Sequence, residues 1–128
     1  KINDEELAVV GSMFGMEGMQ PGEQCRTLLD RYGLRIVILT CGAAGSSVFA
    51  PDTRSYIPTP RVEVADTVGA GDSFTASFLA ALLSGLGIGE AHRLAVEVAA
   101  HVCSQHGAMP RLPERFTARL RNDGSAIR

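Results

Sequence analysis

The chain has 128 residues, of which 45% are hydrophobic and 20% charged, close to the average of soluble globular proteins. A domain of this length buries roughly two thirds of the surface that its unfolded chain exposes, so a real core is expected. The 12 basic and 14 acidic residues give a formal net charge of -2, which supplies no overall positive field for nucleic acid or anionic lipid. A phosphate-bearing ligand therefore needs a local site.

The sequence predicts no membrane span, disulfide framework or zinc site. The longest apolar stretches, residues 36–39 and 78–83, are far shorter than the ~20 residues that cross a bilayer. The first residues also lack a basic-then-apolar leader, so we expect a cytoplasmic protein. The cysteines, Cys25, Cys41 and Cys103, form no C-x-x-C pair and are expected to be reduced and mostly buried. The histidines show no metal-ligand spacing.

The first part of the chain predicts two helices and a buried strand. Residues 4–14 are typical of a short helix with Asn3 as its N-cap, and residues 21–32 of a second helix that begins at a proline and stops at Gly33. Residues 35–40 are short and rich in β-branched side chains, as expected of a strand buried on both faces of a parallel sheet.

The remainder predicts a hairpin followed by helices. Residues 47–50 and 55–57 flank a turn sequence, and residues 61–65 alternate like a further strand. Apolar residues then recur at helical spacing over residues 71–84, 90–105 and 113–120. Helices interleaved with strands predict an α/β fold with helices covering a sheet.

The richest chemistry lies in residues 62–74, which run from a predicted strand through a glycine turn into a helix. Unpaired amides of a first helical turn point at a ligand, the helix dipole favours negative charge, and glycines let the backbone approach oxygen atoms closely. We therefore expect Gly69, Ala70 and Gly71 to form an anion cradle.

Asp72 follows this cradle directly. The positive end of the helix favours a negative charge there, so Asp72 could accept a proton from a bound hydroxyl while the amides stabilise a transferring phosphoryl group. The alternative is an ordinary helix start with an acid in its first turn. The residues alone leave both interpretations open.

Two shorter patterns are ambiguous in the same way. Asn3 and Glu6 fit a capping arrangement at a helix start, which is the favoured interpretation from the residues alone. Thr40, Gly42 and Gly45 follow the buried strand, where ligands of α/β sheets bind, but a strand-ending turn has the same pattern.

Residues 66–74, Asp-Thr-Val-Gly-Ala-Gly-Asp-Ser-Phe, resemble the C-terminal signature of the PfkB, or ribokinase-like, carbohydrate kinases. Residues 1–6 resemble the N-x-x-E motif of that family, residues 40–45 its T-x-G-x-x-G turn, and residues 98–110 its late nucleotide-side helix and G-A turn. The resemblance covers nearly the whole chain. It implies that residues 1–128 form the C-terminal part of a three-layer α/β/α fold, without the N-terminal sugar-binding and lid portion.

The resemblance implies roles for the residues around the glycine turn. Asp72 would be the catalytic base, and the amides of Gly69, Ala70 and Gly71 the anion hole. Asp66 would belong to a monovalent-cation site for potassium, with backbone carbonyls of residues 103–109 as further ligands.

It also implies roles for the shorter patterns. Asn3 and Glu6 would organise magnesium and phosphate, with Glu6 acting through ordered water. Thr40, Gly42 and Gly45 would form a wall for the nucleotide.

The implied function is ATP-dependent phosphorylation of a sugar hydroxyl, and residues 97–110 look most like fructokinase-type members, which favours fructose over ribose. The alternatives are a nucleotide-binding fragment without catalysis, a kinase of a nucleoside or vitamin-like alcohol, and a structural descendant of the fold. Half of a parallel sheet exposes a strand edge, so we also expect a homo-oligomer or association through the missing half. Because the resemblance places the sugar site outside this chain, we expect no activity from the isolated piece.

Overall fold

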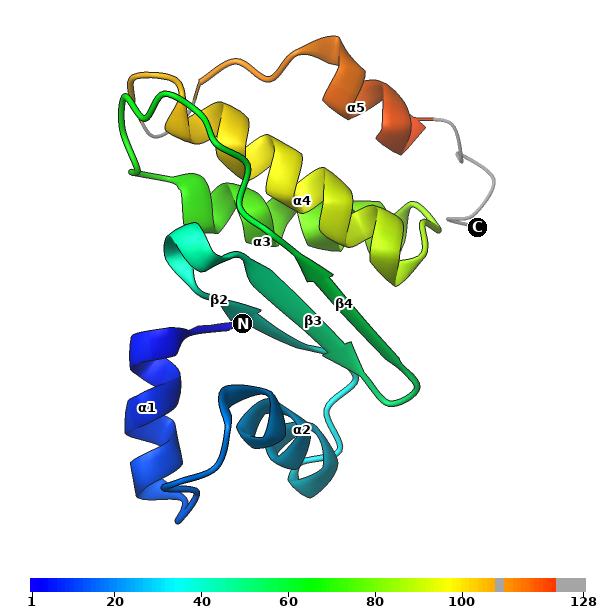
Figure 1. Ribbon diagram of the computed structural model, residues 1–128. Helices are drawn as coiled ribbons and strands as arrows, with labels where there is room; N and C mark the ends of the chain where they lie inside the picture. The colour runs from blue at the N-terminus through cyan, green and yellow to red at the C-terminus, as the bar shows by residue number, and fades with distance from the viewer. Residues whose placement is uncertain (108–109, 122–128) are drawn as a thin grey trace. The chain divides into compact units, whose positions relative to one another are not determined.

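The computed structural model describes residues 1–107 and 110–121, and the chain divides into two compact units, Lys1–Pro58 and Thr59–Arg128 (Figure 1). Unit 1 contains β1 (Ile2–Asn3), α1 (Asp4–Met13), α2 (Pro21–Arg31), β2 (Val37–Thr40), the 3-10 turn η1 (Gly42–Ala44), β3 (Ser46–Ala50) and β4 (Thr53–Ile57). Unit 2 contains α3 (Ala70–Leu83), α4 (Ile88–Cys103) and α5 (Glu114–Arg121). The predicted α/β class is therefore confirmed.

Unit 1 is built on a mixed four-stranded sheet in the order β1-β2-β3-β4. β1 pairs with β2 in parallel, whereas β2 with β3 and β3 with β4 are antiparallel. The predicted hairpin is confirmed, because β3 and β4 pair from Ser46 opposite Ile57 to Ala50 opposite Thr53. The buried strand is also confirmed, although β2 has a parallel neighbour on one side only.

The core of unit 1 lies between this sheet and the helices α1 and α2, which share one face of it (Figure 1). Val37 and Leu39 on β2 and Phe49 on β3 point to that face because alternate residues of a strand share a side. They pack with helix and loop residues into one buried cluster, to which α1, α2 and the loop between them contribute Leu7, Met16, Cys25, Leu28 and Leu29. The cysteines are free, as predicted, but only Cys25 is fully buried.

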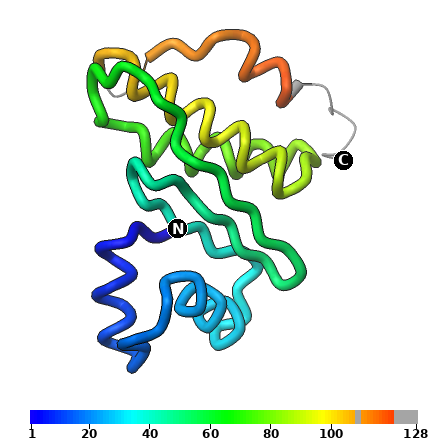
Figure 2. The backbone as a smooth tube through the Cα atoms, viewed as in Figure 1, coloured from blue at the N-terminus to red at the C-terminus, as the bar shows by residue number. Residues whose placement is uncertain are grey.

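Residues 61–65 do not form the strand that their alternation predicts, and they run as irregular chain before α3 (Figure 2). Val62 and Val64 are 38% and 60% exposed, so this alternation marks no buried face. The amide of Ala65 donates instead to the carbonyl of Cys103 at 2.9 Å. That bond gives the segment a fixed position without a sheet partner.

Unit 2 is helical, and α3 packs along α4 (Figure 1). All three helices were predicted, with ends that lie within about two residues of those observed. His92 on α4 is fully buried and its ring meets Phe74 of α3 edge-on, with 6.0 Å between centroids. Among the described residues, no helix has both the length and the apolar character that crossing a membrane requires.

The turn between β2 and β3 needs glycine at one position for two reasons. Gly45 has φ 112° and ψ -166°, a region open essentially to glycine alone. A Cβ at Gly45 would also lie 2.7 Å from the carbonyl oxygen of Ile57. Gly42 has φ 50°, but a Cβ there would meet nothing within 4 Å. The hairpin therefore closes tightly onto the end of this turn.

We expect acid to destabilise the protein through His92. Burial lowers the pKa of His92 from 6.5 to about 4, so the native state holds it neutral while the unfolded state protonates it between these values. The free energy of unfolding should therefore fall by about 3 kcal/mol from this group as the pH drops through that window. Urea titrations of the wild type and His92→Gln at several pH values measure the contribution. His106→Gln, at an exposed histidine, should keep the wild-type slope; an unchanged slope in His92→Gln would contradict the assignment.

We expect Gly45→Ala to lower the free energy of unfolding by at least about 3 kcal/mol, because backbone strain and the contact with the Ile57 carbonyl act together. Gly42→Ala is the matched control in the same turn and should cost about 1 kcal/mol, from the left-handed backbone alone. Chemical denaturation of both variants measures the difference. Equal costs would show that the close approach of the hairpin is unimportant.

Candidate active site

The glycine turn of unit 2 is anchored to the end of α4. The amides of Ala65 and Asp66 both donate to the carbonyl oxygen of Cys103, at 2.9 and 3.2 Å. This carbonyl was one of the oxygens expected around a cation, and it is already occupied by two donors. The anchor fixes where the chain enters the turn.

The carboxylate of Asp66 links the same two segments. Its Oδ1 accepts from the amide of Val68 at 2.9 Å, and its Oδ2 accepts from the amide of Gly107 at 3.4 Å. Asp66 is half-buried, and each carboxylate oxygen retains a further lone pair. Of the described oxygens expected around the cation, those of Asp66 therefore remain able to contact it, whereas the Cys103 carbonyl already accepts two amides. Residues 108 and 109, which complete the predicted loop of ligands, lie outside the described residues.

Gly69 turns the chain into α3. Its φ of 84° and ψ of -6° place it in the left-handed region, and α3 begins at Ala70. The amide of Ala70 donates to the carbonyl oxygen of Thr67 at 3.3 Å. The amides of Gly69, Gly71 and Asp72 have no acceptor within residues 1–107 and 110–121. The positive end of α3 therefore presents open donors, as an anion cradle requires.

Two hydroxyls that the sequence analysis missed hold the carbonyls of the cradle. Ser73 Oγ donates to the carbonyl of Gly69 at 2.7 Å, and Thr75 Oγ1 donates to that of Gly71 at 3.1 Å. Each hydroxyl lies four residues after the glycine that it contacts, a spacing that could have indicated the contact. These bonds direct the carbonyls along α3 and leave the amides facing outward.

Asp72 is exposed in the first turn of α3. In the described part of the chain its carboxylate has no hydrogen bond or ion pair. It therefore retains full capacity to accept a proton. The single salt bridge of these residues, Arg119 with Glu97 at 2.9 Å, involves other side chains.

In unit 1, Asn3 and Glu6 form a capping box. The amide of Glu6 donates to Asn3 Oδ1 at 2.8 Å, and the amide of Asn3 donates to Glu6 Oε2 at 2.9 Å. The capping interpretation is therefore confirmed. Glu6 is exposed, and its Oε1 has no partner among the described residues, so a contact to a cation through water fits the same arrangement.

The two patterns of unit 1 are neighbours, because Asn3 on β1 is the register partner of Thr40 on β2. Parallel strands end at the same edge of a sheet, so the capping box and the turn that follows Thr40 lie together there. Tyr56 Oη, which the sequence analysis did not single out, donates to the carbonyl of Ala44 at 2.7 Å and braces the turn.

The predicted residues thus form two groups, one in each unit. Asn3 and Glu6 lie beside the turn at residues 40–45 in unit 1, and Asp66 lies beside residues 69–72 in unit 2. Across the described ranges, no cluster of three or more His, Cys, Asp or Glu side chains could hold a metal ion. Any divalent cation would need ligand and water oxygens for most of its coordination.

Residues 1–115 match the pfkB family of carbohydrate kinases. Among curated proteins, a fructokinase of Rhizobium leguminosarum bv. trifolii is 39% identical over 82 residues, which are 64% of this chain and 23% of the fructokinase. The chain therefore spans about a quarter of the length of this relative.

Two solved ribokinases share the fold. The Thermotoga maritima enzyme is 28% identical with a TM-score of 0.79, over 94% of this chain and 41% of the ribokinase. The Arabidopsis thaliana enzyme, solved with ribose and ATP, is 27% identical with a TM-score of 0.72, over 93% and 39% of the two chains. The predicted ribokinase-like fold is confirmed, and this chain belongs to the pfkB family of carbohydrate kinases.

Proposed function

We propose that residues 1–128 form the C-terminal, phosphoryl-transfer part of an ATP-dependent sugar kinase. The observation that carries the proposal is that, within residues 1–107 and 110–121, the carboxylate of Asp72 and the amides of Gly69 and Gly71 have no hydrogen-bond partner. A base and an anion hole in one helical turn are the two devices that phosphoryl transfer needs from the protein.

In the proposed reaction, Asp72 accepts the proton of a sugar hydroxyl as that oxygen bonds to the γ-phosphorus of ATP. The bond between this phosphorus and the bridging oxygen of ADP breaks at the same time. The amides of Gly69 and Gly71 stabilise the charge on the equatorial oxygens, and the amide of Ala70 joins them by giving up its 3.3 Å bond to Thr67. The phosphorylated sugar leaves, and Asp72 releases its proton to water.

Unit 1 supplies the nucleotide side in this proposal. The turn at residues 40–45 would form one side of the nucleotide site. Glu6 Oε1, which has no partner among the described residues, would accept a hydrogen bond from a water molecule bound to magnesium. Magnesium neutralises phosphate charge when it is bound with ATP. Asp66 would contribute to a potassium site next to the anion hole.

The substrate class rests on the relatives. A relative named fructokinase and a ribokinase solved with ribose and ATP both match most of this chain. We propose ATP and a small sugar of the fructose or ribose type, with fructose favoured by residues 97–110. Another relative, 34% identical over 101 residues, is named nucleoside kinase, which makes a nucleoside the second candidate acceptor.

The 128-residue chain by itself has a narrower role in this proposal. It spans 23% of the fructokinase and 41% of a solved ribokinase, so most of the region that these relatives possess lies outside it. We propose that the isolated chain binds ATP with magnesium weakly and transfers no phosphate. Calorimetry with ATP, with and without sugars, would reveal any sugar-dependent turnover.

In the kinase that carries this chain, we expect Asp72→Asn to lower kcat by at least about a hundredfold, because general base catalysis supplies that much, while the KM for ATP stays close to wild type. Glu90→Gln is the matched control, since Glu90 occupies the same place in the first turn of α4. A coupled assay of ADP release measures both variants. Turnover of Asp72→Asn close to that of Glu90→Gln would remove Asp72 from the mechanism.

We also expect potassium to raise the turnover of that kinase above the value in sodium, and Asp66→Asn to abolish the difference. Asparagine keeps the oxygen that accepts from Val68 but replaces the one that accepts from Gly107 with an NH2 donor, so the free energy of unfolding should also fall, by about 1 kcal/mol. Assays at matched ionic strength in KCl and NaCl decide the point. Equal stimulation in the variant would mean that Asp66 binds no monovalent cation.

A further inference from the structure

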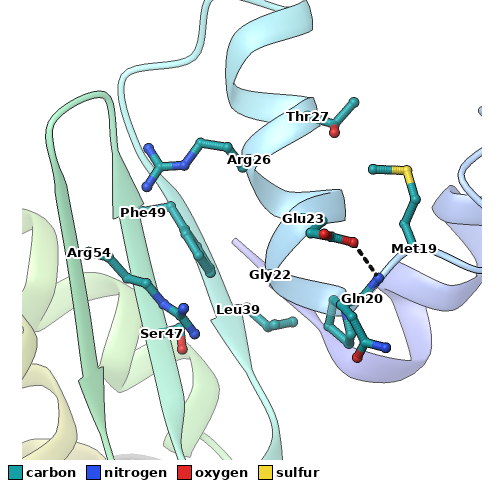
Figure 3. Close-up of a pocket in the computed structure, with 11 residues that line it drawn as sticks. Met19, Gln20, Gly22, Glu23, Arg26, Thr27, Leu39, Ser47, Phe49 and Arg54 are labelled. Carbon is teal, nitrogen blue, oxygen red and sulfur yellow. Dashed lines mark hydrogen bonds between the residues drawn. The ribbon is translucent and has the colours of Figure 1, made fainter.

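A cavity of about 800 Å³ opens in unit 1 between the start of α2 and the strands β2 to β4 (Figure 3). None of the residues proposed above lines it. The strand register explains its wall, because Leu39 pairs with Ser47, and Phe49 pairs with Arg54. Ser47 and Phe49 are two residues apart, so all four side chains share one face of the sheet.

Two arginines flank the aromatic ring of Phe49 in this wall. The guanidinium carbon of Arg54 lies 5.2 Å from the ring centroid and that of Arg26 lies 5.7 Å from it. Arg26 Nη1 also donates to the carbonyls of Ala50 and Pro51, at 2.6 and 3.3 Å. Arg54 has no hydrogen bond or ion pair in the described part of the chain. Its contact with Phe49 therefore positions a guanidinium whose donors are unused.

Ser47 adds a hydroxyl group to the wall of the cavity. Its exposed fraction is 8%, it lines the cavity, and its hydroxyl makes no hydrogen bond within the described residues. Among the described residues only His101 Nε2 is a fully buried side-chain nitrogen or oxygen atom without a partner, so the hydroxyl of Ser47 is accessible from the cavity. An oxygen of a ligand in the cavity would satisfy this hydroxyl.

The net charge of the lining residues and the positive end of the α2 dipole both favour an anionic ligand. Arg26 and Arg54 oppose the single acid Glu23, whose carboxylate accepts from the amide of Gln20 at 3.1 Å. The lining thus keeps a net positive charge, and the positive end of α2 adds to it. Met19, Leu39 and Phe49 contribute apolar surface beside these groups (Figure 3).

We propose that this cavity binds a small organic oxyanion. Its phosphate or carboxylate group would pair with the guanidinium of Arg54 and accept from Ser47 Oγ, while its carbon skeleton lies on the apolar wall. An inorganic ion would fill only a small part of about 800 Å³. The site goes beyond the proposed phosphoryl transfer, because Asp66 and residues 69–72 take no part in it.

An NMR titration of the ¹⁵N-labelled 128-residue chain tests the site. Glycerol 3-phosphate and succinate are the two anionic probes, and glycerol is the neutral control. We expect saturable shifts of the amides of Gly22, Ser47 and Arg54 with an anion and none with glycerol. The probe that binds more tightly identifies phosphate or carboxylate as the preferred group.

Arg54→Gln should weaken binding at least tenfold, as expected for the loss of a charged hydrogen-bonding partner worth about 1.4 kcal/mol or more. Ser47→Ala removes only a hydroxyl and should weaken anion binding about threefold or more. This second variant keeps the test valid if Arg54→Gln disturbs the packing on Phe49. Arg35→Gln removes the same charge from an exposed position outside the cavity and should leave binding unchanged.

Shifts confined to residues 69–72, an equal loss in Arg35→Gln, or no saturable shift at the cavity would overturn the proposal. The first of these outcomes would leave the anion hole at α3 supported, so failure of this site is distinguishable from failure of the kinase assignment.

Discussion

The carboxylate of Asp66 is the contact on which the site of unit 2 depends, because it accepts one amide from the glycine turn and one from the segment after α4. Together with the carbonyl of Cys103, it holds a stretch of irregular chain that has no sheet partner. An irregular segment would otherwise satisfy its polar groups by bonding to whatever lies nearby, the amides of the helix start included. Held in this way, the segment leaves the amides of Gly69 and Gly71 without acceptors among the described residues. A preorganised anion hole needs such open donors.

The capping box of unit 1 also leaves a side-chain oxygen available for another contact. Asn3 and Glu6 each engage one side-chain oxygen with the other's amide. Because a carboxylate has two oxygens, Glu6 can cap α1 and still present Oε1 to water around a cation. The structural and functional interpretations of N-x-x-E therefore do not compete. The cap orients the carboxylate, and parallel pairing with Thr40 places it beside the turn at the edge of the sheet.

Local patterns were enough to predict the helices, the hairpin and the glycine turn at the start of α3, since spacing, caps and turn residues act within a few positions. The error at residues 61–65 has a physical cause: alternation predicts a strand only where a partner edge exists, and there the amide of Ala65 bonds to Cys103 instead. Contacts between distant positions could not be predicted. The brace from Tyr56 to Ala44 needs the hairpin register, and the cavity arises because that register brings Ser47 and Arg54 to one face.

The two proposed anion sites, at the start of α3 and in the cavity of unit 1, differ in a way that suits their proposed roles. A guanidinium close to Asp72 would pair with its carboxylate and make it a poor base, whereas backbone amides carry partial charges that stabilise phosphate oxygens without neutralising an acid beside them. In the described part of unit 2, Asp72 accordingly has no ion pair. No proton transfer is required in the cavity of unit 1, so a full charge such as that of Arg54 carries no such penalty there. The same electrostatic constraint therefore favours backbone donors beside the proposed base Asp72. It allows an arginine in the proposed site of unit 1, where only binding is needed.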